Sequence, residues 1–81
     1  LYYTGLTQYR LKRYADARRT LERATQDLDS LDEENAPIFH DRAMVRFQAG
    51  DRAGAQRDFF RAVYLMPETV AQKNQFGDTL E

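Results

Sequence analysis

The stretch from Ala49 to Pro67 constrains the fold more than any other part of the sequence. Its Gly50-Asp51 pair is typical of a helix that ends in a left-handed glycine cap and is followed at once by the N-cap of a new helix. Apolar and small residues then recur at helical spacing. Pro67 ends the pattern because the residue before a proline is pushed out of the helical region. The stretch therefore predicts a tight turn and an amphipathic helix over residues 52–65.

An earlier stretch, from Leu11 to Leu28, follows the same pattern. Large and small residues recur in the same order at a spacing of 38 residues. The matched pairs are Gly5 with Ala43, Tyr9 with Phe47, Ala17 with Ala55, Leu21 with Phe59, and Ala24 with Ala62. Because small residues recur where two helices would touch, the pattern indicates a tandem helical repeat and not amphipathicity alone.

Helical periodicity predicts five helices along the chain. We expect them over residues 1–12, 15–31, 38–49, 52–65 and from Thr69 onward. Gly5 lies inside the first helix, where it predicts the close approach of a neighbouring helix. Pro37 suits the first turn of the third helix, because its missing N–H is not needed there. Phe59 and Phe60 cannot both face one core, so one of them is expected at a seam between repeats or at the surface.

The order of these residues resembles the tetratricopeptide repeat family over essentially the whole chain. The residues that carry the resemblance are Ala43, Gly50, Ala55, Phe59, Ala62 and Pro67 in the second unit, and Gly5, Tyr14, Ala17, Leu21 and Ala24 in the first. The period departs from the family's value of about 34 residues, and we place the additional turn in a second helix lengthened to Leu31. Lys12 stands where the family has its turn glycine, and Arg42 stands at a position that is usually apolar.

The resemblance implies an all-α fold of stacked helix-turn-helix repeats, a right-handed α-solenoid of about two and a half repeats. Residues 1–81 would form a single domain. Repeat one is expected at 1–36, repeat two at 37–68, and a partial repeat or capping helix at 69–81. Because the sequence opens at Leu1, we expect it to be a piece of a longer protein.

Catalytic and cofactor chemistry finds little support in the composition. The chain has no cysteine, which excludes disulfides and thiolate metal sites and fits a reducing compartment such as the cytoplasm. His40 is the only histidine, and the converging partners that a metal site or a nucleophilic triad needs are missing. No phosphate-binding glycine loop is present. We therefore expect no enzyme, no metal and no cofactor.

Charge and hydropathy limit the other classes of partner. The net charge of −1 argues against a general polyanion binder. The basic residues between Arg10 and Arg23 are interpreted as a solvated helix face, so no nucleic-acid partner is expected. No apolar run approaches the length of about 20 residues that spans a bilayer, so no membrane partner is expected either.

In the tetratricopeptide family the first helices of the repeats line a concave groove, which implies a partner-binding surface here. The groove candidates are Tyr2, Leu6, Tyr9, Arg10, His40, Met44, Phe47 and Asn74. For Tyr9 and Phe47, groove and core remain equally open. Family members that bind acidic chaperone tails place cations in this groove. Here the corresponding positions supply no cation, and Asp41 would repel such a tail, so we do not expect that partner.

The leading functional hypothesis is a protein–protein interaction module, a scaffold or adaptor that binds a peptide or helix in this groove. The alternative is a structural spacer, a segment of a longer repeat array that packs into a multiprotein assembly. An aromatic-lined groove would favour peptide binding. Exposed aromatic side chains at Tyr3, Phe60 or Tyr64 would favour the spacer.

Overall fold

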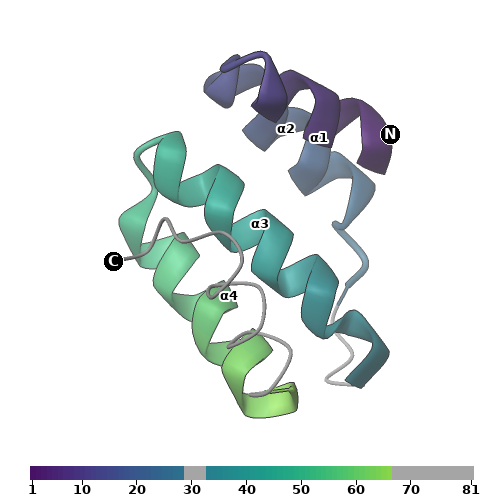
Figure 1. The fold of residues 1–81 in the computed structure, drawn as a ribbon, viewed down its shortest axis with the longest axis vertical. Coiled ribbons are helices and arrows are strands. Elements are labelled where there is room, and N and C mark those ends of the chain that lie inside the picture. Colours follow the sequence, from purple (N-terminus) through teal and green to yellow (C-terminus); the bar gives the residue numbers. More distant parts are fainter. Residues whose placement is uncertain (29–32, 67–81) are drawn as a thin grey trace.

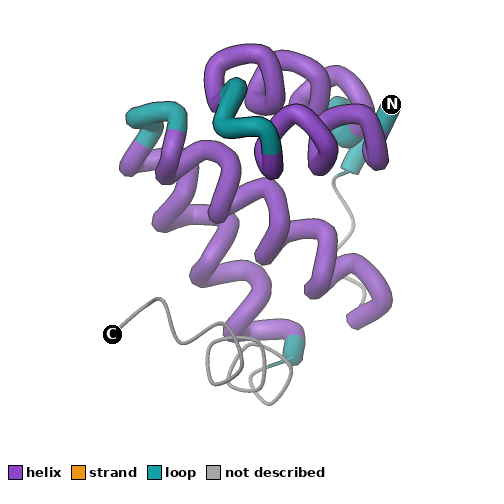
Figure 2. The backbone as a smooth tube through the Cα atoms, turned by 45° about the horizontal axis from the view of Figure 1, so that its top comes forward, coloured by secondary structure: helices purple, strands orange, loops and turns teal. Residues whose placement is uncertain are grey.

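The computed structural model describes residues 1–28 and 33–66, and within these ranges it contains four α-helices and no β-strand. Helices α1 (Tyr2–Arg10) and α2 (Tyr14–Ala24) form one helical hairpin. Helices α3 (Ala36–Gln48) and α4 (Arg52–Leu65) form a second hairpin, which a short 3-10 turn, Glu33–Asn35, precedes. Figure 1 shows α3 lying between the first hairpin and α4, and the tilted view in Figure 2 shows the same order. The described chain is therefore all-helical, as predicted.

The turns inside the two hairpins have the same backbone structure at a spacing of 38 residues. Lys12 and Gly50 both adopt a left-handed conformation, with φ of 63° and 94°. The N–H of Lys12 donates to the carbonyl of Tyr9 and that of Gly50 to the carbonyl of Phe47. The next N–H, of Arg13 or Asp51, reaches back five residues in both cases. These paired bonds satisfy the last carbonyls of each helix, as in a Schellman motif.

Several expectations for individual residues are confirmed. Asp51 is the N-cap of α4 and accepts a hydrogen bond from the N–H of Gly54, which lowers the pKa of its carboxyl group. Pro37 lies in the first turn of α3. A Cβ at Gly5 would come within 3.3 Å of the backbone nitrogen of Leu21, so α2 does approach α1 closely there. Phe60 is exposed, whereas Phe59 is half-buried.

Two small clusters form the core, one between the two hairpins and one mainly within the second hairpin. Ala17 and Leu21 of α2 pack with Val45 of α3, and the partly buried rings of Tyr2 and Tyr9 lie against them. The second cluster joins Phe39 of α3 to Ala62 of α4, with Leu28 and Leu65 packed against it. Of the residues expected to be buried between helices, Ala17, Leu21, Ala55 and Ala62 are buried, and Ala24 and Phe59 are half-buried.

The predicted length of the second helix is wrong, because α2 ends at Ala24 and not at Leu31. The hydroxyl and the N–H of Thr25 both bond to the carbonyl of Leu21. The carbonyl of Thr25 accepts from the N–H of Leu28 in a turn, and it also faces Arg42. Leu28 then packs on the α3–α4 cluster instead of continuing the helical stripe. The fifth predicted helix, from Thr69, lies outside the described residues.

Candidate functional site

The groove residues predicted on α1 and α3 lie on neighbouring helices, but they differ in how far they are exposed. Arg10 is exposed, whereas Tyr2, Leu6, Tyr9 and Met44 are half-buried. Phe47 keeps 48% of its surface exposed, and the guanidinium of Arg52 lies 5.9 Å from its ring centroid. Asn74 lies outside the described residues. Phe47 is thus the aromatic side chain that this face presents most fully.

Tyr2 and Tyr9 are held by the protein itself. The hydroxyl of Tyr2 donates a hydrogen bond of 2.5 Å to Asp41, which ties α1 to α3. Burial and this bond raise the pKa of Tyr2 well above its ordinary value. Tyr9 packs against the core cluster and meets the ring of Tyr14 edge-on at 5.5 Å, and burial raises its pKa as well. These rings stabilise the fold on the face where the groove was predicted.

His40 is buried instead of facing a groove. Its ring packs edge-on against Phe59, with centroids 5.6 Å apart. The Nδ1 atom lies 3.8 Å from a carboxylate oxygen of Asp41. Neither ring nitrogen has a hydrogen-bond partner among the described residues. The histidine is therefore a residue of the α3–α4 contact and is not presented to a partner.

A buried carboxylate, Asp58 of α4, organises a second site. Its side chain is fully buried and accepts hydrogen bonds from three arginines. Arg42 binds it through two donors, Nε and Nη2, at 2.8 and 2.9 Å. Arg46 adds a bond of 2.8 Å and Arg61 one of 3.1 Å. A buried carboxylate needs such partners, because burial without them would cost several kcal/mol, on the order of 3–5.

This cluster extends to the first hairpin. Nη1 of Arg42 donates to the hydroxyl of Thr25 at 3.1 Å, and Nε of Arg46 donates to Glu22 at 3.1 Å. Glu22 also pairs with Arg18, its neighbour one turn earlier in α2. Side chains of α3 therefore bridge α2 and α4 through charge-assisted bonds, which are stronger than neutral ones.

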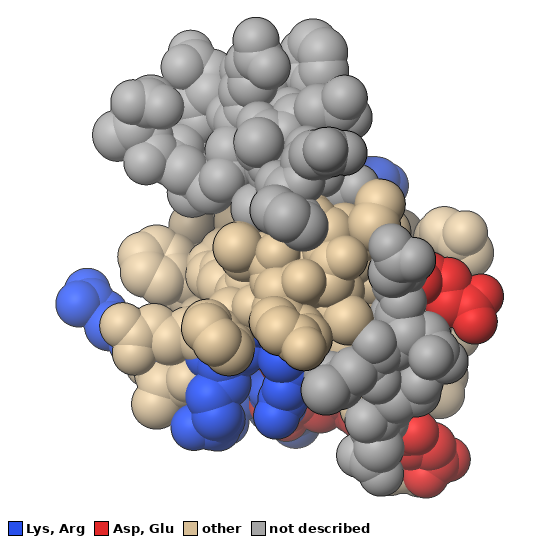
Figure 3. Space-filling model, turned by 90° about the horizontal axis from the view of Figure 1, so that it is seen from below, with Lys and Arg blue, Asp and Glu red and all other residues tan. Residues whose placement is uncertain are grey.

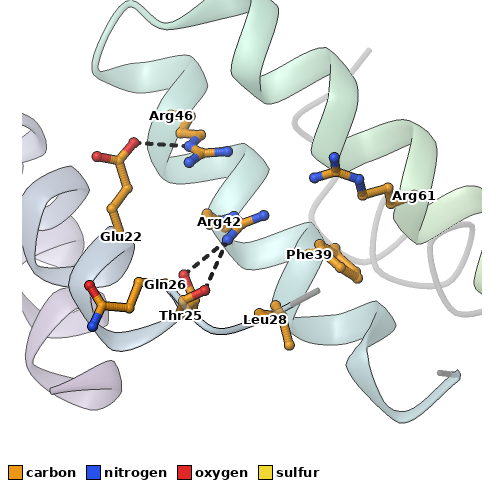
Figure 4. A pocket seen from close by; sticks show the side chains of 8 residues that line it. All are labelled: Glu22, Thr25, Gln26, Leu28, Phe39, Arg42, Arg46 and Arg61. Atoms are coloured by element: carbon orange, nitrogen blue, oxygen red, sulfur yellow. Dashed lines mark hydrogen bonds and ion pairs between the residues drawn. The ribbon is translucent and has the colours of Figure 1, made fainter. Parts of the chain in front are cut away.

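The arginine cluster borders a pocket of about 570 Å³ between α2, α3 and α4. Figure 4 shows Arg42 and Arg46 pointing toward Arg61, with Phe39 on the lower side of the space between them. The guanidinium carbons of Arg42 and Arg61 lie 5.4 and 5.6 Å from the Phe39 ring centroid. The lining residues are Glu22, Thr25, Gln26, Leu28, Phe39, Arg42, Arg46 and Arg61.

The outer face of α4 is a third surface, and it is apolar. Phe60 and Tyr64 are 71% and 70% exposed, and Val63 between them is 45% exposed. Their spacing of three and four residues puts them on one side of the helix. In Figure 3, uncharged atoms fill the centre of the described surface, and basic and acidic side chains gather in separate places at its edges.

Sequence reasoning did not find the arginine cluster. The one signal in the sequence that points to it is Arg42, a charge at a position that is usually apolar in the family that the chain resembles. The role of Asp58 could not be seen, because its partners on α3 are 12 and 16 residues away and meet it only through helix packing.

Comparisons with protein-family models, with curated proteins and with solved structures found no match to this chain. Within residues 1–28 and 33–66, no group of three or more His, Asp or Glu side chains could hold a metal ion. The helices of the described ranges also include none that is long and apolar enough to cross a membrane.

Proposed function

We propose that the chain is a protein-interaction module of helical-repeat type, similar to tetratricopeptide repeats, and that a partner helix packs on the outer face of α4. The observation that carries the proposal is the contiguous exposure of Phe60, Val63 and Tyr64 on that face. Three large apolar side chains on one exposed helix face are typical of a surface that another protein covers.

The packing of α3 on α2 indicates which kind of helix would cover the outer face of α4. The residues 38 positions before Phe60, Val63 and Tyr64 are Glu22 of α2 and Thr25 and Gln26, which follow its end. There, α3 packs on α2, with Arg46 bound to Glu22 and Arg42 bound to Thr25. A helix stacked on α4 in the same way would meet Phe60 and Val63. Because these positions are polar in the first hairpin and apolar in α4, the covering helix should present apolar side chains.

The same surface supports a second candidate, the structural spacer. Exposed rings at Phe60 and Tyr64 are what we expect of a spacer. In that case the covering helix is the partial repeat predicted at 69–81 or belongs to another repeat of the same protein, and the stack continues as a solenoid. The predicted concave groove is the competing surface for a partner. Its aromatic rings at Tyr2 and Tyr9 are engaged in the fold, which leaves Phe47 as its main exposed aromatic contact.

Site-specific photo-crosslinking tests the proposal in the intact protein in its own cell. A benzophenone amino acid replaces Phe60 on the α4 face, Phe47 on the predicted groove, or Arg19 as an exposed control on α2. We expect a discrete cross-linked product at position 60 and none at position 19. A product that joins two protein chains indicates an interaction module, whereas a link within one chain indicates the spacer.

The other outcomes also decide between surfaces. A product at position 47 alone would keep the interaction module but move its binding site to the groove. Equal products at positions 19 and 60 would indicate nonspecific collisions, and the absence of any product at 47 and 60 would overturn the proposal.

A further inference from the structure

Among the described residues, the pocket between α2, α3 and α4 has more arginines than acidic side chains around it. Among the described residues, three arginines border it and two acids, Asp58 and Glu22, bind them. This leaves an excess of one positive charge. Arg18 and Asp51 at the rim, 3.8 Å apart, add one charge of each sign and do not change the excess.

The three arginines differ in how many of their guanidinium N–H groups already form hydrogen bonds. Arg42 uses Nε, Nη1 and Nη2 on Asp58 and Thr25. Arg46 uses Nε and Nη1, and its Nη2 has no hydrogen bond within the described ranges. Arg61 uses only Nη1. Its Nε and Nη2 form no hydrogen bond to residues 1–28 or 33–66, so one complete donor fork has no partner within these ranges.

Arg61 lines the pocket and is partly exposed. The side chain of Arg61 is 39% exposed, while Asp58 behind it is fully buried. Asp58 and the ring of Phe39 hold the guanidinium in place, with its carbon 5.6 Å from the ring centroid. A pre-oriented guanidinium loses less entropy on binding than a free surface arginine. The pocket volume of about 570 Å³ lies within the range of small-ligand sites.

We propose that this pocket binds a carboxylate group through the Nε–Nη2 fork of Arg61, with Arg46 as the second cation. A planar carboxylate matches the two parallel donors of an arginine fork. A carboxylate carries one negative charge, which equals the excess of the pocket. A phosphate carries nearly two at neutral pH and would leave the pocket negative. A small organic acid would supply this carboxylate, in keeping with a pocket volume in the range of small-ligand sites.

This site is separate from the surface assigned above. It uses none of Phe60, Val63 and Tyr64, so its failure would leave the proposed function standing. It also differs from the α1–α3 face, where Asp41 argues against an acidic ligand. Asp41 does not line the arginine pocket.

The test is an NMR titration of the purified chain with sodium acetate at constant ionic strength, with the arginine Nε–Hε resonances as the readout. We expect saturable shifts of the Arg61 and Arg46 resonances. In Arg61→Gln the affinity should fall about tenfold, since one charge-assisted pair is lost. Arg61→Lys, which keeps the charge but not the fork, should give a smaller loss. Arg57→Gln removes an exposed arginine of the same helix outside the pocket and should bind like the wild type.

A second series with inorganic phosphate separates the two kinds of oxyanion. Acetate that saturates the Arg61 resonance at lower concentration than phosphate supports the proposal. Phosphate that binds more tightly through the same residues overturns the carboxylate assignment. The proposal is also overturned if the wild type shows no saturable shift, or if Arg57→Gln loses as much affinity as Arg61→Gln. Far-ultraviolet circular dichroism establishes that each variant is folded, and the wild-type titration stands without any variant.

Discussion

Lys12 and Gly50 occupy the same position in the two hairpins, and both have a positive φ. A residue with a Cβ costs about 1–2 kcal/mol in this conformation, whereas glycine adopts it freely. Lys12→Gly should therefore raise the free energy of unfolding by about 1 kcal/mol, because relief of strain exceeds the added entropy of the unfolded chain. In a chain of this size that corresponds to a rise in melting temperature of about 4–8 °C.

The matched control is Gly50→Ala. Nothing lies within 4 Å of a Cβ at Gly50, so the change adds backbone strain without a clash. It should lower the free energy of unfolding by about 1 kcal/mol. Thermal melts of the two variants measure both effects. A neutral or destabilising Lys12→Gly would contradict the left-handed turn in the first hairpin.

Single residues also show where sequence reasoning stops. The glycine cap at Gly50 and the N-cap at Asp51 follow from local chemistry, because their partners lie within a few residues. Arg42 and Asp58 are different, since each would be costly to bury alone and only the pair makes burial tolerable. Their contact depends on how α3 crosses α4, which no local pattern contains. The arginine pocket was therefore beyond prediction, although the charge at Arg42 marked an unusual position.

The bounds of a helix could be predicted where capping residues or a proline close to its ends determine them. The α4 helix has the predicted bounds, because a cap precedes it and a proline follows it. The end of α2 was misplaced because Leu28 suits a longer helical stripe equally well. Two tertiary contacts end α2 earlier. Leu28 packs against the Phe39 cluster, and Arg42 donates a hydrogen bond to the hydroxyl of Thr25. Long-range contacts override periodicity where no local stop signal is present.

The bond between Tyr2 and Asp41 joins α1 to α3 and predicts how the packing of these helices depends on pH. Burial first, and then this bond, raise the pKa of Tyr2 in the folded state above the value of about 10 in the unfolded chain. The contribution of Tyr2 to the free energy of unfolding is therefore fully present below a pH of about 10 and is lost as the pH rises above that value. Tyr2→Phe should lower the free energy of unfolding at pH 7 by about 1 kcal/mol.

Chemical denaturation at a series of pH values measures this dependence. Above a pH of about 10, Tyr2→Phe should lose stability less steeply than the wild type. Some alkaline loss should remain, because the pKa of Tyr9 is also raised by burial. Tyr3→Phe is the matched control, because Tyr3 is 79% exposed and is the smallest of the causes that raise the pKa of Tyr2, so this variant should keep most of the wild-type alkaline loss. Equal alkaline slopes for Tyr2→Phe and the wild type would refute the role of this bond.

The molecule as a whole divides its buried residues unevenly between the two hairpins. Six residues of α3 and four of α4 are buried, against one of α1 and two of α2. The hairpins meet mainly where α3 packs on α2, through Val45 and the arginine bridges. In a stack of this kind each unit depends on its neighbour, and the unit with less buried surface opens first. We therefore expect α1 and α2 to open more readily than α3 and α4.

Ala17 and Ala55 test this expectation because they are the same position of the repeat, and both are buried. An arginine at either site places a charge in a tight helix contact, at a cost of several kcal/mol, which is comparable to the total stability of about 5 kcal/mol for a small domain. Ala55→Arg should unfold the whole chain, because it disrupts the hairpin on which the other one packs. Ala17→Arg should open α1 and α2 while the amides of α3 and α4 keep measurable protection from hydrogen exchange. Equal loss in both variants would mean that the hairpins unfold as one unit, and a wild-type melting transition in Ala55→Arg would refute the alignment of the two repeats.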